Sequence, residues 1–93
     1  MSRVVFLDAG VLGLLTTRPG KSPLAAACCH WLGSLQYGRV RLIVPEVTDY
    51  EVRRELLRLN RVAAVRRLDD LAKNTEYLPL TTPAVRRAAE LWA

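Results

Sequence analysis

The chain has 93 residues, enough for one domain, and at this size folding buries only about 60% of the surface that the unfolded chain exposes. Its composition, 51% hydrophobic and 25% charged, is that of a globular protein, and no apolar run approaches the roughly 20 residues that span a bilayer. The net charge of +5 comes almost entirely from arginine, which binds phosphate through its forked guanidinium but is equally common on a solvated surface.

The amino terminus superficially resembles a secretion signal, because an apolar segment precedes the sequence LAAAC. Asp8 interrupts that segment, and Arg18, Pro19 and Lys21 separate it from LAAAC, so we expect a cytoplasmic protein. The adjacent Cys28 and Cys29 cannot form an ordinary disulfide, and with His30 they lack the spacing of a zinc site. We interpret both cysteines as small apolar core residues.

The predicted elements alternate between strands and helices. The first strand, VVFL at residues 4–7, is apolar throughout, which predicts a strand buried on both faces. It is followed by a helix in the segment VLGLL and a loop TTRPGKSP. The next helix has Ser22 as its N-cap and Pro23 at its first position, and Gly38 is its C-terminal stop. A strand from 40 to 44, two helices within 48–74 that break near Asn60 and a strand from 76 to 80 come next, and the last helix starts with Thr82 as N-cap and Pro83 at its first position.

Strands that alternate with helices predict an α/β fold with right-handed crossovers and a parallel sheet. The last helix has an apolar side made of Val85, Ala88, Leu91 and Trp92, and the sequence stops within it. In a sheet of three parallel strands the first strand would normally be central, but here we expect it at an uncovered edge, which is a hazard for unwanted strand pairing. We therefore expect residues 1–93 to form one domain that is incomplete at its C-terminus, or whose open edge is paired by a partner.

Two carboxylates are candidates for a metal site. Asp8 follows the first strand, and Glu51 follows the second, in the segment PEVTDYEVRREL. The carboxyl ends of adjacent parallel strands lie on one rim of the sheet, so these residues can face each other and share Mg²⁺ or Mn²⁺, which prefer oxygen ligands. Alternatively, Asp8 is a helix N-cap, and Thr48 with Glu51 forms a capping box; for Glu51 the cap is the favoured interpretation.

The segment TRPGKS contains Gly-Lys-Ser, as phosphate-binding loops do. The full motif requires a glycine where this chain has Leu15, and the segment does not begin where a strand ends. We therefore expect Lys21 to be an ordinary loop charge rather than part of a nucleotide-binding loop.

Three segments, VVFLDAGVLGLL, IVPEVTDYEVRRELLR and EYLPLTTPAVRRAAELWA, in this order resemble the first two-thirds of a PIN domain, the fold of VapC-type toxin ribonucleases. The resemblance implies a three-layer α/β fold, a parallel sheet flanked by helices, here without its last strands. It also implies metal-dependent hydrolysis of RNA by a cluster of acids that binds Mg²⁺ or Mn²⁺. The family's first two acids correspond to Asp8 and Glu51.

This chain departs from the family pattern at two points. Ala9 and Gly10 follow the first acid, where the family often has Thr or Ser and then Asn, and no residue corresponds to the family's third and fourth acids. We therefore expect weak or absent ribonuclease activity in this chain alone. Asp69 and Asp70 are expected to pair with arginines of their own helix, Arg66 and Arg67.

The expected partner is RNA, whose phosphates would be contacted by Arg18, Lys21, Arg53 and Arg54. The alternative function belongs to a different class: a non-catalytic module that binds an antitoxin-like protein or a second copy of itself, through its exposed strand edge or its C-terminal helix.

Overall fold

The computed structural model describes residues 3–35, 38 and 40–92, except for the side chains of Ala88, Leu91 and Trp92. Its elements follow the predicted order. They are β1 (Arg3–Phe6), α1 (Ala9–Thr16), the short 3₁₀ helix η1 (Pro19–Lys21), α2 (Pro23–Leu35), β2 (Val40–Pro45), α3 (Glu46–Arg58), α4 (Val62–Asn74), β3 (Glu76–Leu78) and α5 (Thr82–Trp92).

The three strands form a parallel sheet in the order β1-β2-β3, so β1 lies at an edge, as predicted. Phe6 is paired with Ile43, and Ile43 is paired with Glu76. The backbone N–H of Leu7 donates to the Ile43 carbonyl at 2.9 Å and continues the ladder by one residue. Asp8 is therefore held directly at the carboxyl end of β1, next to the point where β2 leads into α3.

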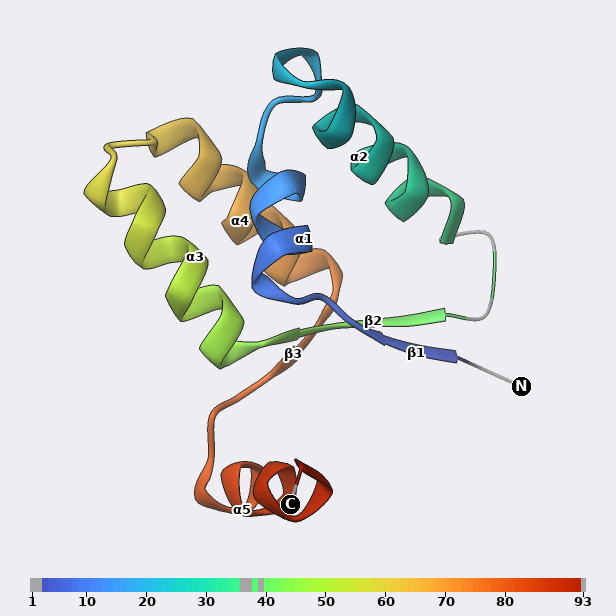
Figure 1. Ribbon diagram of the computed structural model, residues 1–93, viewed down its shortest axis with the longest axis vertical. Coiled ribbons are helices and arrows are strands. Elements are labelled where there is room, and N and C mark those ends of the chain that lie inside the picture. Colours follow the sequence, from blue (N-terminus) through green and yellow to red (C-terminus); the bar gives the residue numbers. More distant parts are fainter. Residues whose placement is uncertain (1–2, 36–37, 39, 93) are drawn as a thin grey trace.

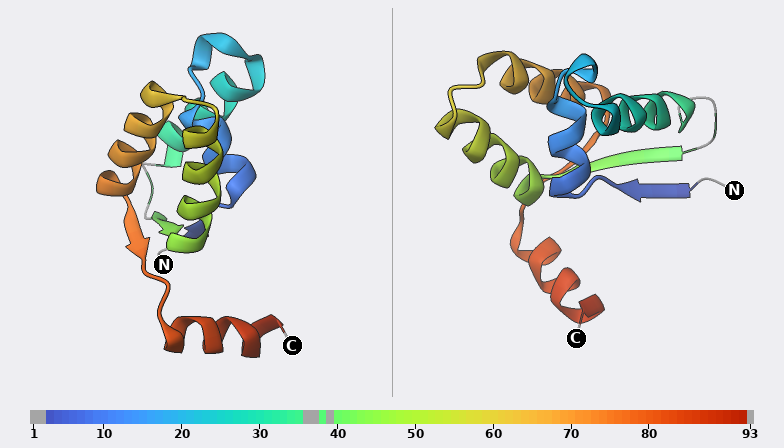
Figure 2. Two further views of the ribbon diagram at one scale, coloured as in Figure 1. Left: turned by 90° about the vertical axis from the view of Figure 1, so that its left-hand side faces the viewer. Right: turned by 45° about the horizontal axis from the view of Figure 1, so that its top comes forward.

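Helices α1 to α4 lie on one side of the sheet, whereas α5 lies beyond the sheet on the opposite side (Figures 1 and 2). Helix α1 packs against α2, α3 and α4 and is the centre of the helical layer. The expected α/β fold, with a parallel sheet flanked by helices, is confirmed. No helix in the described part of the chain has the length and apolar character needed to cross a membrane.

The core lies between the sheet and the helical layer. It consists of Leu7, Leu12, Leu15, Val44, Val52 and Leu68, which are all buried. Cys28 and Cys29 are unpaired and pack against this cluster, which confirms their predicted role, and burial raises the pKa of the Cys28 thiol.

The prediction that the first strand is buried on both faces is wrong. Val5 packs against the core, but Val4 and Phe6 point to the other face and are 45% and 57% exposed. The physical reason is that the crossovers through α1–α2 and through α3–α4 place all four helices on one face (Figure 1). Helix α5, the remaining helix of the described residues, lies away from β1 in all three views (Figures 1 and 2).

Two predicted helix starts differ from the structure. Helix α3 begins at Glu46 with Pro45 at its N-cap, so Thr48 lies inside the helix. Helix α5 begins at Thr82, and the residue before it acts as the cap, because the Thr81 hydroxyl oxygen accepts a hydrogen bond from the Ala84 N–H at 3.2 Å. Of the apolar side predicted for α5, Val85 is half exposed; the side chains of Ala88, Leu91 and Trp92 lie outside the described residues.

Candidate functional site

Asp8 is the N-cap of α1. Its Oδ1 accepts a hydrogen bond from the backbone N–H of Val11 at 2.8 Å, in the extended conformation that N-cap residues adopt. The side chain is exposed, and within the described residues its second oxygen, Oδ2, has no hydrogen-bond or ion-pair partner. Asp8 is therefore fixed in orientation by the cap while one carboxylate oxygen remains available to solvent.

Glu51 is not part of a capping box, and the prediction that favoured this role is wrong. A capping box requires Thr48 at the N-cap, but α3 begins two residues earlier, at Glu46. The Thr48 hydroxyl instead donates to the Pro45 carbonyl at 3.0 Å. Glu51 is exposed in the second turn of α3, and no hydrogen bond or ion pair involves its carboxylate among the described residues.

These two carboxylates stand on helices that pack against each other. Helix α1 begins where β1 ends and α3 begins where β2 ends, so both helices start at the same edge of the sheet (Figure 1). Within the described residues, no group of three or more His, Cys, Asp or Glu side chains could hold a metal ion. Asp8 and Glu51 offer the oxygen ligands that Mg²⁺ and Mn²⁺ prefer, but water or a ligand would have to supply most of the coordination shell.

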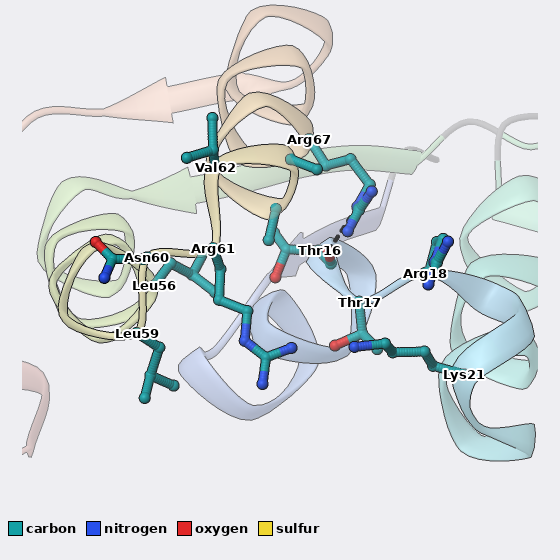
Figure 3. Close-up of a pocket in the computed structure, with 12 residues that line it drawn as sticks. Thr16, Thr17, Arg18, Lys21, Leu56, Leu59, Asn60, Arg61, Val62 and Arg67 are labelled. Carbon is teal, nitrogen blue, oxygen red and sulfur yellow. Dashed lines mark hydrogen bonds between the residues drawn. The ribbon is translucent and has the colours of Figure 1, made fainter.

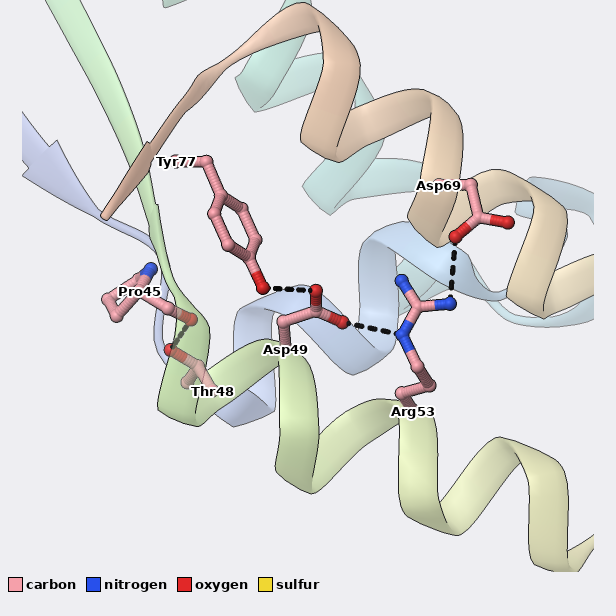
Figure 4. Close-up of polar contacts among 6 residues, drawn as sticks. All are labelled: Pro45, Thr48, Asp49, Arg53, Asp69 and Tyr77. Atoms are coloured by element: carbon pink, nitrogen blue, oxygen red, sulfur yellow. Dashed lines mark hydrogen bonds and ion pairs between the residues drawn. The ribbon is translucent and has the colours of Figure 1, made fainter. Parts of the chain in front are cut away.

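The buried acidic residue of α3 is Asp49, which the sequence analysis did not single out. It is 6% exposed and lies between two partners: Arg53 Nε donates to Oδ1 at 3.0 Å, and the Tyr77 hydroxyl donates to Oδ2 at 2.7 Å (Figure 4). Arg53 Nη1 also pairs with Asp69 on α4 at 2.7 Å. The four side chains connect α3 to α4 and β3.

This network shifts two of its pKa values. Burial, together with the hydrogen bond to Asp49, raises the pKa of Tyr77 to about 12. Burial disfavours the charge on Arg53, but hydrogen bonds to Asp69 and Asp49 outweigh it and raise the pKa of the guanidinium. The expected pairing of Asp69 with arginines of its own helix is wrong: Asp69 pairs with Arg53 of α3, and Arg67 donates to the Thr16 carbonyl instead. One contact of this network could have been predicted from the sequence: Asp49 and Arg53 are four residues apart on one helix face, the spacing of an ion pair.

Of the two arginines predicted in α3 to contact RNA, Arg53 is thus held by two carboxylates, whereas Arg54 is exposed. Arg54 lines a shallow, open depression of about 390 Å³ together with Tyr50, Glu51, Glu55 and Arg58. Glu55 forms an ion pair with Arg58, and this hydrogen-bonded partner lowers the pKa of the Glu55 carboxyl.

The other two predicted RNA contacts, Arg18 and Lys21, lie in a larger pocket of about 840 Å³ at the far end of α1 from Asp8. Two arginines that the sequence analysis did not select, Arg61 and Arg67, also line it (Figure 3). No sequence signal joins these four residues, because they come from two segments that are about 40 residues apart. We call this site the cationic pocket.

The Gly-Lys-Ser sequence has no phosphate-loop geometry. Gly20 and Lys21 belong to the short helix η1, and the Ser22 hydroxyl oxygen accepts a hydrogen bond from the Ala25 N–H at 2.9 Å, which caps α2 as predicted.

Comparison of the chain with protein-family models, with curated proteins and with solved structures finds no match. The candidate site therefore has to be interpreted from its own chemistry.

Proposed function

We propose that this chain is a PIN-like domain that acts on RNA, with Asp8 and Glu51 as two carboxylate ligands for Mg²⁺ or Mn²⁺ and with little or no cleavage by this chain alone. The observation that carries the proposal is that Glu51 has no capping role: its carboxylate is exposed on α3, which packs against the helix that Asp8 caps. The resemblance of the sequence to PIN-domain ribonucleases supports the choice of RNA.

The chemistry of such a site follows from its residues. The hydrogen bond from Val11 fixes the Asp8 carboxylate and leaves Oδ2 for an ion, while Glu51 would contribute from α3. A bound divalent ion would supply an activated water and offset charge on a phosphodiester. With only two carboxylates, few charged ligands compensate for dehydration of the ion, so we expect weak binding.

The experiment is a manganese titration followed by water-proton relaxation. Asp8→Asn is the central variant, because asparagine is as good an N-cap as aspartate but removes the negative charge. Glu51→Gln tests the second ligand, and Asp70→Asn, an exposed position on α4, is the matched control for loss of one charge.

We expect binding at micromolar to low millimolar Mn²⁺ that is lost in Asp8→Asn, weakened in Glu51→Gln and kept in Asp70→Asn. Equal titrations of wild type and Asp8→Asn would contradict the metal site. An RNA cleavage assay with and without EDTA tests the second part of the proposal: robust, EDTA-sensitive cutting that Asp8→Asn abolishes would show that the chain is a competent nuclease.

A second candidate function is self-association through the edge strand β1. The observation that favours it is that Val4 and Phe6 on this strand are exposed, beside an edge that no described strand pairs. A second copy of the chain could pair its own β1 with this edge and extend the sheet. An antitoxin-like segment bound at the same edge is the alternative occupant that a test must distinguish.

A further inference from the structure

The cationic pocket is formed by two parts of the chain that meet above α1. One part is the end of α1 with the turn and the short helix η1 that follow it. The other is the end of α3, its connection to α4 and the first half of α4 (Figure 3). Its lining contains four cationic side chains, Arg18, Lys21, Arg61 and Arg67, and no carboxylate. Like charges gathered without a counter-charge repel one another, and a bound anion would relieve that repulsion.

Three of the four cations have no described acidic partner. Among the described residues, no ion pair involves Arg18, Lys21 or Arg61, although ion pairs hold other arginines of the chain. In Figure 3, Lys21 and Arg61 extend toward the middle of the pocket from opposite sides. Their charged groups are therefore available to a ligand.

Arg67 has a different role. Its Nε donates to the carbonyl oxygen of Thr16 at 2.6 Å, which satisfies a carbonyl at the C-terminal end of α1 and fixes the guanidinium at the pocket wall. A guanidinium has five N–H donors, so this bond leaves four of them for other acceptors. A fixed arginine with free donors loses little side-chain freedom when it binds a phosphate.

The two threonine hydroxyls of the pocket already donate hydrogen bonds within the protein, so an anion would be held by the four cations. The hydroxyl protons of Thr16 and Thr17 both point to the carbonyl oxygen of Gly13, at 2.9 and 3.0 Å, so neither is available to a ligand. The rest of the lining includes apolar side chains: Leu56, Leu59, Val62, Ala63 and Ala64. Such a lining can contact a sugar or a base beside a phosphate.

The backbone on the α3–α4 side is preorganised. Asn60 has φ = 54°, in the left-handed region that asparagine tolerates better than most residues. The N–H of Asn60 donates to the Leu57 carbonyl at 3.1 Å and the N–H of Arg61 donates to the Leu56 carbonyl at 2.9 Å. This closed turn holds Arg61 over the end of α1 before any ligand binds.

We propose that the cationic pocket is a binding site for phosphate groups, supplied either by the backbone of single-stranded RNA or by a free nucleotide. Arg18, Lys21 and Arg61 contact the phosphates, and Arg67 contributes from the wall. The site is distinct from Asp8 and Glu51: Asp8 caps the start of α1 and the pocket begins at its last residue, about 12 Å along a helix of this length.

The test measures binding of a short, fluorescein-labelled single-stranded RNA by fluorescence anisotropy in EDTA, so that the result does not depend on the metal site. The pocket variant combines Lys21→Ala with Arg61→Ala. The matched control combines Lys73→Ala with Arg86→Ala, which removes the same two residue types from exposed positions on α4 and α5. Helix content by circular dichroism verifies that both double variants fold.

We expect the pocket variant to weaken RNA binding by about tenfold or more, as loss of charge-assisted hydrogen bonds does, while the control changes little. The slope of log K against log salt should fall by roughly 1.4 in the pocket variant, since each phosphate contact to single strands contributes about 0.7. Equal loss in both double variants, or no RNA or ATP binding by wild type, would overturn the proposal.

Competition with unlabelled ATP identifies the source of the phosphate. Displacement of the RNA by ATP, with an ATP affinity that falls in the pocket variant, assigns the pocket to free nucleotides. Persistent RNA binding in excess ATP assigns it to the RNA backbone. Only the metal-site proposal depends on Asp8 and Glu51. A manganese titration that shows no binding, together with RNA or ATP binding that the pocket variant weakens, would therefore refute the metal site and leave the phosphate site standing.

Discussion

The hydroxyl of Tyr77 on β3 donates a hydrogen bond of 2.7 Å to Oδ2 of Asp49 on α3. This bond joins residues 28 positions apart and orients a carboxylate that is almost fully buried. Arg53 donates to the other oxygen, Oδ1, and compensates the charge of the carboxylate, so both oxygens of Asp49 accept a hydrogen bond. A buried carboxylate with both oxygens bound is a structural element of the fold, and the exposed Asp8 and Glu51 remain the candidates for chemistry.

Removal of either partner in this bond should destabilise the fold. Tyr77→Phe should lower the free energy of unfolding by about 1 kcal/mol, the usual net value of one hydrogen bond. Asp49→Ala should cost more, about 1 to 3 kcal/mol, because it leaves two donors without their acceptor. Urea unfolding measures the loss of stability in both variants. Tyr50→Phe is the control, because Tyr50 is an exposed tyrosine on α3, the helix of Asp49. An Asp49→Ala variant as stable as wild type would refute the structural role.

The stability of the protein should fall at alkaline pH through Tyr77. Its pKa is raised from 10 to about 12 in the folded state, mainly by burial and then by the bond to Asp49. A raised pKa favours the protonated form, so the contribution is fully present below about pH 10 and is lost as the pH rises to 12. The measurement is the unfolding free energy of wild type minus that of Tyr77→Phe across this range. A difference independent of pH would contradict the prediction.

The two roles of Asp8 can be separated by two substitutions. Asp8→Ala removes the N-cap of α1 and should lower the free energy of unfolding by about 0.5 to 2 kcal/mol, whereas Asp8→Asn should cost little. Thermal or urea unfolding of both variants provides the comparison. If both lost the same stability, the negative charge rather than the cap would account for the effect of Asp8 on folding.

If the chain self-associates through β1, Phe6→Lys should abolish it, because a lysine on an edge strand opposes pairing. The substitution should change stability little, since Phe6 is 57% exposed. Multi-angle light scattering measures the mass, and Val85→Lys on α5 tests the C-terminal helix in the same way. A dimer that survives Phe6→Lys but not Val85→Lys would place the contact on α5, and a wild-type monomer at high concentration would exclude self-association.

Helix α1 should be stabilised by Gly13→Ala. Gly13 lies inside the helix, an added Cβ would have no heavy atom within 4 Å, and its φ is not positive. Alanine favours the helix over glycine by about 0.5 to 1 kcal/mol, so the unfolding free energy should rise by that order. Calorimetry of wild type and variant is sufficient, and a lower melting temperature would show that the position does not tolerate a side chain.

The order of elements, the parallel sheet, the position of Asp8 after the first strand and the helix break near Asn60 could all be predicted from the sequence. These features depend on local signals: apolar runs, N-caps and the alternation of strands with helices. The structure confirmed β1 at an edge, but it also moved the N-cap of α3 by three residues, from Thr48 to Pro45. That shift removed the capping role of Glu51, because a cap depends on the helix boundary, which sequence patterns locate only to within a few residues.

Sequence by itself determined which segments form strands and helices, because those choices are set by neighbours a few positions away. Only the tertiary structure decided which side chains meet. The crossovers put four helices on one face and left Phe6 exposed. The hydrogen bond from β3 brought Tyr77 to Asp49, and packing of α4 against α3 brought Asp69 to Arg53. The fold over the end of α1 placed Arg61 with Lys21. These contacts join distant parts of the chain, and no local pattern in the sequence encodes them.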